Sequence, residues 1–105
     1  MNPSKVKRSE IVLLTDLPNV GKSIAADLVL LGIVKPDDLR GKDGWSLYEK
    51  LCFATKQFQD PCLLDVLISL EDFTNGKKAK PWWDFTEPRK MKYAKDIEKL
   101  RANFN

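Results

Sequence analysis

The stretch that most constrains the fold runs from residue 14 to residue 28. Two leucines, Leu14 and Leu17, lead into Pro18-Asn19-Val20-Gly21, and an apolar-periodic segment follows. Its apolar side chains share one face at helical spacing: Ile24, Ala25, Leu28 and Leu31. Asn and Gly tolerate left-handed backbone, so this turn can be tight enough to fold one helix back on the next.

The same stretch resembles a helix-hairpin-helix element, whose usual signature is Gly-hydrophobic-Gly followed by three residues and Ala. Here the signature reads Asn19-Val20-Gly21, then Ala25. Asn replaces the first Gly, and Asn can still take a positive φ at modest cost. We therefore predict a helix-hairpin-helix at about residues 10–32, with a first helix over 9–14 and a second over about 22–31.

The resemblance to DNA-binding hairpins implies a phosphate site. In such elements, backbone N–H groups of the turn and of the second helix hold a phosphate, helped by the helix dipole. The implied donors are the amides of Asn19, Gly21, Ser23 and Ile24, with side-chain contacts from Lys22 and Ser23. The resemblance also implies a monovalent cation that bridges to the phosphate and is bound by the carbonyls of Thr15, Leu17 and Val20. Phosphate contacts of this kind are independent of base sequence.

Three features favour the alternative that the hairpin is only structural. Asn19 stands where a Gly would allow close backbone approach, and Ser23 stands where a Lys is frequent. Asp16 and Asp27 add negative charge nearby. In this alternative the hairpin packs inside a protein-interaction adaptor.

The remaining segments predict helices. Asp43 precedes an amphipathic segment over residues 45–58, and Asp60-Pro61 opens a segment that is apolar nearly all round, typical of a central core helix. A last helix follows Pro88, and no alternating strand pattern is present. We predict an all-α fold: a SAM-like compact bundle of five to six helices over residues 9–105, preceded by a flexible basic arm at residues 1–8.

Several spaced motifs resemble the small bacterial "pathogenicity locus" family of helix-hairpin-helix proteins, some of which are labelled mitomycin resistance proteins. The motifs occur in one order: residues 17–22, Leu31-Gly32-Ile33, Asp37-Asp38-Leu39, Asp60-Pro61-Cys62 and residues 81–85. The resemblance covers roughly residues 10–90 and supports the hairpin fold.

The residue inventory argues against an enzyme. The chain has no histidine and two cysteines, which removes Ser-His and Cys-His catalysis and leaves too few ligands for a zinc site. We expect no catalytic residue, no side-chain metal site and no cofactor beyond the monovalent cation. No apolar run is long enough for a membrane span and the polar N-terminus lacks a signal region, so we expect a cytoplasmic protein.

The charge distribution suggests a second binding surface. Basic side chains concentrate toward the two ends of the chain, whereas residues 11–76 carry more acidic than basic side chains. Trp82 and Trp83 could stack on unpaired bases, anchor a protein partner, or simply close the core. The basic residues that would accompany them are Lys77, Lys78, Lys80, Arg89 and Lys90.

The sequence therefore predicts a non-catalytic protein that binds DNA phosphates through the hairpin, without sequence preference. The alternative is the protein-interaction adaptor, and the oligomeric state stays open.

Overall fold

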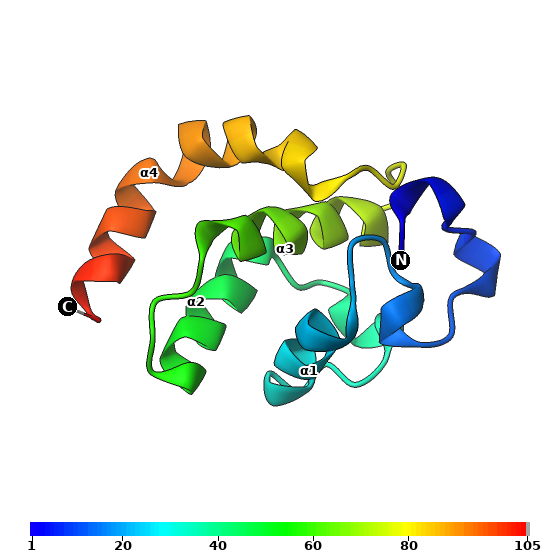
Figure 1. The fold of residues 1–105 in the computed structure, drawn as a ribbon, viewed down its shortest axis with the longest axis horizontal. Coiled ribbons are helices and arrows are strands. Elements are labelled where there is room, and N and C mark those ends of the chain that lie inside the picture. Colours follow the sequence, from blue (N-terminus) through cyan, green and yellow to red (C-terminus); the bar gives the residue numbers. More distant parts are fainter. Residues whose placement is uncertain (105) are drawn as a thin grey trace.

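The computed structural model describes residues 1–104, and the regular structure of this part of the chain is entirely helical (Figure 1). Four α-helices are present: α1 (Lys22–Leu30), α2 (Gly44–Thr55), α3 (Pro61–Thr74) and α4 (Thr86–Ala102). Three short 3-10 turns precede α1: η1 (Pro3–Lys5), η2 (Arg8–Glu10) and η3 (Leu14–Asp16). Two more lie between α-helices: η4 (Pro36–Leu39) and η5 (Trp82–Phe85). The predicted all-α class is confirmed. None of the helices in residues 1–104 has the length and apolar character needed to cross a bilayer.

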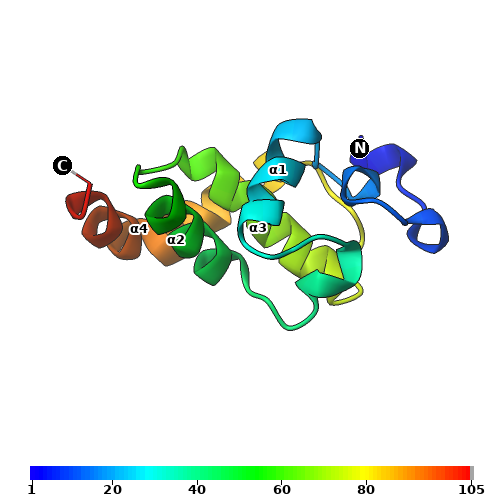
Figure 2. The same cartoon turned by 90° about the horizontal axis from the view of Figure 1, so that it is seen from below.

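Helix α3 forms the centre of the molecule. In Figure 1 it runs between α4 above and α1 and α2 below, and Figure 2, which views the molecule from below, shows α2 in front of α4 and α1 in front of α3. Its start matches the predicted signal, since Asp60 accepts a hydrogen bond from the Cys62 N–H and Pro61 occupies the first turn. Half of its residues are buried: Leu64, Asp65, Val66, Leu67, Ser69, Leu70 and Phe73. A helix covered on several faces organises the elements around it.

Helices α2 and α3 approach closely at Gly44. The Gly44 N–H donates to a carboxylate oxygen of Glu71 at 2.7 Å, and Asp43 caps α2 by accepting from the Ser46 N–H. A Cβ on Gly44 would lie 2.8 Å from the backbone nitrogen of Ile68 and 2.9 Å from the carbonyl carbon of Leu67. Only glycine therefore allows the backbones of these two helices to come this close.

The predicted first hairpin helix over residues 9–14 is wrong, and the structure has four α-helices in residues 1–104 instead of five to six. The cause is Asp16, whose carboxylate accepts hydrogen bonds from the N–H groups of Val12 and Leu13. These donors are thereby withdrawn from an α-helical ladder, and the chain makes the 3-10 turn η3 instead. Val12 is 73% exposed, so no packing compensates for the low helix propensity of a β-branched residue.

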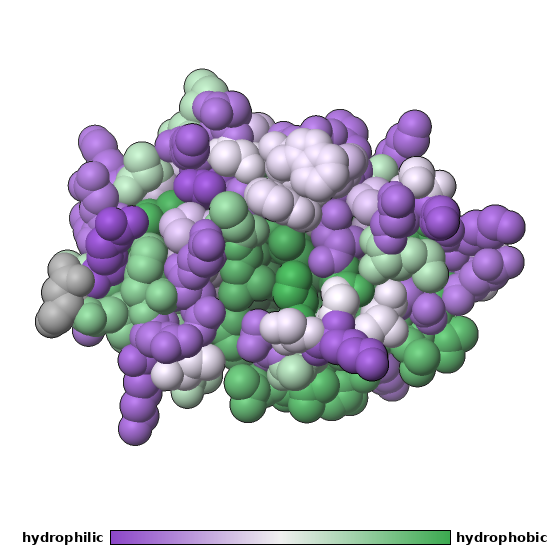
Figure 3. All heavy atoms as spheres, in the orientation of Figure 1, coloured by the Kyte–Doolittle hydropathy of each residue, from purple (hydrophilic) through white to green (hydrophobic). Residues whose placement is uncertain are grey.

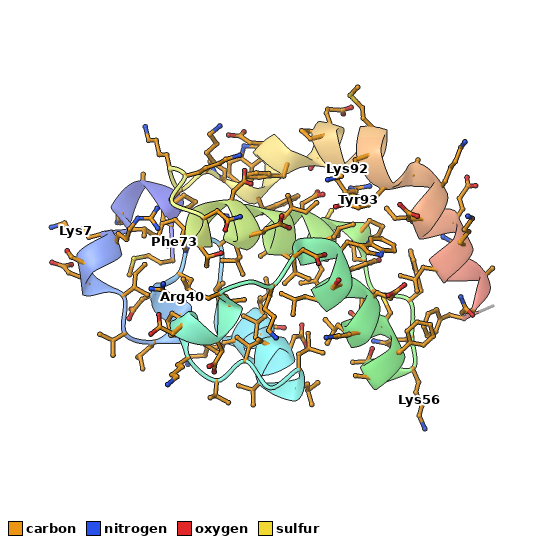
Figure 4. All side chains as sticks on the ribbon, turned by 180° about the vertical axis from the view of Figure 1, so that it is seen from behind. Lys7, Arg40, Lys56, Phe73, Lys92 and Tyr93 are labelled. Atoms are coloured by element: carbon orange, nitrogen blue, oxygen red, sulfur yellow. The ribbon has the colours of Figure 1, made fainter. Side chains whose placement is uncertain are left out.

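Residues 1–8, predicted as a flexible basic arm, lie against the domain. The Arg8 guanidinium donates to the carbonyl oxygens of Phe73 at 2.7 Å and Lys77 at 2.8 Å, and it lies 3.9 Å from the centre of the Phe73 ring. Figure 4 shows Phe73 at the end of α3 beside this segment. The N-terminal segment is thus joined to the C-terminal end of the core helix.

Helix α4 and the residues just after it pack along the domain. Tyr93 stacks on Trp45 with ring centres 5.3 Å apart, and Phe104 contacts Phe53 at 5.2 Å. Near the start of α4, Arg89 donates to the fully buried Asp65 of α3 at 2.8 Å. The C-terminal helix therefore docks within the same chain.

Substituting Gly44 by Ala should lower the free energy of unfolding by about 1–3 kcal/mol, because α2 and α3 must separate to admit the new methyl group. Urea denaturation followed by circular dichroism measures the change. Gly21→Ala is the matched control, since a Cβ at Gly21 meets nothing within 4 Å and its φ is negative. Equal stability of the two variants would contradict the close approach.

Candidate nucleic-acid interface

The turn between residues 17 and 21 has the left-handed residue that the sequence predicts. Asn19 has a φ of 67°, and the Val20 N–H closes the turn on the Leu17 carbonyl at 3.3 Å. Leu17 and Val20 are both 1% exposed. The turn is therefore anchored in the core, with Pro18 also buried and Asn19 half-buried, and the chain becomes exposed at Gly21.

The side chain of Asn19 makes three hydrogen bonds that the glycine of the usual signature, having no side chain, cannot make. Its amide nitrogen donates to the Ser69 hydroxyl at 3.1 Å and to the Lys80 carbonyl at 2.9 Å. Its amide oxygen accepts from the Trp82 N–H at 3.2 Å. One residue therefore joins the turn to α3 and to the loop that carries the tryptophans.

Helix α1 begins with an exposed and uncapped turn. Its N-cap residue is Gly21, and no side chain within residues 1–104 accepts a hydrogen bond at this end. Gly21, Lys22 and Ser23 are exposed, and Ile24 is half-buried. Because the first N–H groups of a helix have no intrahelical acceptor, those of Gly21, Ser23 and Ile24 are available to an anion.

The amide of Asn19, predicted as a fourth donor, is engaged inside the protein. It donates to the carbonyl oxygen of Met1 at 2.8 Å. The geometry therefore leaves three of the four implied backbone donors for a phosphate, together with the side chains of Lys22 and Ser23.

The three carbonyls implied for a cation converge on one point. The oxygens of Thr15, Leu17 and Val20 lie 3.3, 3.0 and 2.9 Å from a single nitrogen, the α-ammonium of Met1. The three carbonyl oxygens implied for a cation are therefore directed toward one position.

The turn at residues 17–21 and the tryptophans share one open groove. Residues far apart in the chain line it: Met1, Asn2, Pro3, residues 19–21 and residues 81–83. Trp83 is 61% exposed, and its ring meets the half-buried Trp82 edge-on at 5.7 Å. The two surfaces that the sequence predicts separately are therefore neighbours.

The basic residues predicted for this surface divide into two groups. The first group, Lys78 and Lys80, is exposed. The second group, Lys77 and Lys90, is also exposed, but each ammonium nitrogen lies 3.8 Å from a carboxylate oxygen, of Asp72 and of Glu87 respectively.

Arg89 does not belong to this surface. It is 8% exposed and its guanidinium faces Asp65, whose other oxygen accepts from the Thr86 hydroxyl at 2.7 Å. This pairing raises the pKa of Arg89. The one signal in the sequence was Asp65 itself, a carboxylate within an otherwise apolar helix, which needs a buried partner.

Fold and site together define a small all-helical protein in which a tight turn presents an exposed helix N-terminus. The chain belongs to the pathogenicity locus family, whose model matches residues 7–91. It is also 44% identical over 77 residues to the mitomycin resistance protein McrB of Streptomyces lavendulae, an alignment that covers 73% of each chain. No solved structure gives a significant match. The family that the sequence motifs suggested is thus confirmed.

Replacing Asn19 by Gly should keep the left-handed turn but lower the free energy of unfolding by about 1–3 kcal/mol, since three hydrogen bonds are lost. Asn19→Ala should cost more, because it loses the same bonds and strains the backbone at a positive φ. Thermal and urea unfolding measure both. An Asn19→Gly variant as stable as the wild type would contradict the bridging role.

Proposed function

We propose that this protein binds DNA non-catalytically and without sequence preference, through the hairpin turn and the first turn of α1. The observation that carries the proposal is the exposed, uncapped start of α1 directly behind a tight left-handed turn. Backbone N–H groups there point to one side, and the helix dipole adds partial positive charge at the same place. A phosphate oxygen accepts hydrogen bonds from these N–H groups, and its negative charge is favoured at the positive end of the helix dipole.

The groove supports a specific mode of binding. A phosphate held at residues 21–24 places the adjoining nucleotide near Pro81, Trp82 and Trp83, which line the other side. The exposed ring of Trp83 offers a stacking surface for an unpaired base, and such stacking tolerates every base. Strands with unpaired bases should therefore bind more tightly than a continuous duplex.

Charge reversal at Lys22 tests the phosphate site. In fluorescence anisotropy with labelled single-stranded and duplex DNA, Lys22→Glu should weaken binding and reduce the log–log salt slope by at least about 1, because a phosphate contact is lost. Lys56→Glu makes the same charge change on a side chain that points away from the molecule at the opposite end from Lys7 (Figure 4). Equal losses in the two variants would show general electrostatics instead of a site at the turn.

The same titration can isolate one backbone donor. Ser23→Ala removes the hydroxyl, whereas Ser23→Pro removes the hydroxyl and the N–H without deleting an intrahelical hydrogen bond. Helix α4 itself carries Pro88 in its first turn, so this chain accommodates proline at such a place. Weaker DNA binding by the Pro variant than by the Ala variant supports the amide contact, and equal affinity speaks against it.

A second candidate function, the protein-interaction adaptor, is favoured by exposed apolar side chains. Val29, Leu30 and Val34 are 52%, 64% and 64% exposed at the end of α1 and just beyond it. Figure 3 shows hydrophobic surface gathered along the lower edge of the molecule, where Figure 1 places α1. Binding through this surface would persist at high salt, whereas phosphate binding weakens steeply.

A further inference from the structure

A second pocket, which we call the Arg8 pocket, lies between residues 2–8 and the loop that follows α3. It has a volume of about 540 Å³, within the range of ordinary ligand sites. Parts of residues 2–8 line one side, and Phe73, Lys78, Ala79 and Pro81 line the other. Figure 1 shows this loop, in yellow, beside the first residues of the chain, in blue. The pocket therefore depends on the contact between two segments that are far apart in the sequence.

The lining of the Arg8 pocket favours an anionic ligand that also has an apolar part. Arg8 and Lys78 supply positive charge, and none of the lining residues within 1–104 is acidic. Apolar walls come from Val6, Phe73 and Pro81. A nucleotide combines a charged phosphate with a flat base, so its chemistry matches both kinds of lining group.

Arg8 removes an obstacle to anion binding at this place. The carboxyl end of a helix carries partial negative charge, and the end of α3 lies at the pocket. The Arg8 guanidinium donates to the carbonyl oxygens of Phe73 at 2.7 Å and Lys77 at 2.8 Å. These bonds use two of its five N–H groups, and the guanidinium stays charged at every relevant pH. The negative end of α3 is thus covered by a permanent cation.

The Arg8 pocket adjoins the groove that contains Trp82 and Trp83, which we call the tryptophan groove. Asn2, Pro3 and Pro81 line both. Lys80, directly before Pro81, is exposed. The start of α1, the two tryptophans, Pro81 and Lys78 therefore follow one another along a continuous surface.

We infer that a single strand of DNA held at the start of α1 continues past Trp83 into the Arg8 pocket, where Lys78 and Arg8 pair with a further phosphate. The inference rests on the proposed function, because the strand is anchored at residues 21–24. It adds a second phosphate site and makes the ligand a strand of several nucleotides. The two sites reinforce each other, since a strand bound at one is held at high effective concentration near the other.

A length series of labelled oligothymidylates, from about two to about twelve nucleotides, tests the inference by fluorescence anisotropy. Lys22→Glu should weaken binding at every length, because it disturbs the anchor. Lys78→Glu should leave the shortest strands unchanged and weaken the long ones by about fivefold or more. It should also lower the salt slope of the long strands by about 0.7, the value for one phosphate contact on a single strand. Lys56→Glu, at the opposite end of the molecule from Lys7, is the matched control and should keep the length dependence of the wild type (Figure 4).

The two variants separate failure of the inference from failure of the proposed function. If Lys22→Glu weakens binding but Lys78→Glu loses the same factor at all lengths, or no more than Lys56→Glu, the inference is overturned and the anchor at the turn stands. If the wild type binds no strand, or Lys22→Glu binds as the wild type does, both are overturned. An oligoglutamate of equal charge that competes as well as the long strand would also overturn the inference, because the pocket would then attract any polyanion.

Photocrosslinking follows the path of the strand in the wild-type protein, without any substitution. Oligothymidylates that contain 4-thiothymidine are irradiated in the complex, and mass spectrometry identifies the crosslinked residues. Short strands should crosslink near Trp83, and long strands should also crosslink within residues 2–8 or 73–79. Long strands that crosslink only to the residues reached by short ones would contradict the path through the Arg8 pocket.

Discussion

The burial of α3 is the constraint on which the rest of the structure depends. A helix with apolar side chains on most of its surface must be covered from several directions. Helix α2 covers it across the close contact at Gly44, α4 covers it through the Asp65–Arg89 pair, and the turn at residues 17–21 covers it where Asn19 meets Ser69. Each covering element makes at least one polar contact with α3, and polar contacts are directional whereas apolar packing is not.

The turn at residues 17–21 is formed by groups that come from four parts of the chain. Residues 15–20 provide the backbone, Met1 accepts a hydrogen bond from the Asn19 N–H, and Ser69 and residues 80–82 receive the Asn19 side chain. No α-helix precedes the turn in the described residues, and tertiary contacts fix the turn while the start of α1 stays exposed.

The sequence predicted those features that depend on local chemistry. The caps at Asp43 and Asp60, the central position of α3 and the positive φ of Asn19 follow from residue type and spacing. Two features that it did not predict depend on contacts between distant residues: Arg89 turns inward to Asp65, and the Asn19 side chain reaches Ser69 and Lys80. The absence of the first helix has a local cause that the apolar pattern does not show, since Asp16 accepts from the N–H groups of Val12 and Leu13, only four and three residues away.

The contact between Asn19 and Trp82 gives the protein an internal spectroscopic reporter. The backbone of Trp82 is one hydrogen bond away from the left-handed residue of the turn, and its ring meets the solvent-exposed ring of Trp83. Any event that alters the φ of Asn19 changes the position of an indole next to water. The third tryptophan, Trp45, is stacked on Tyr93 between α2 and α4 and provides a constant background. Emission from this chain therefore reports the conformation of the turn without an added label.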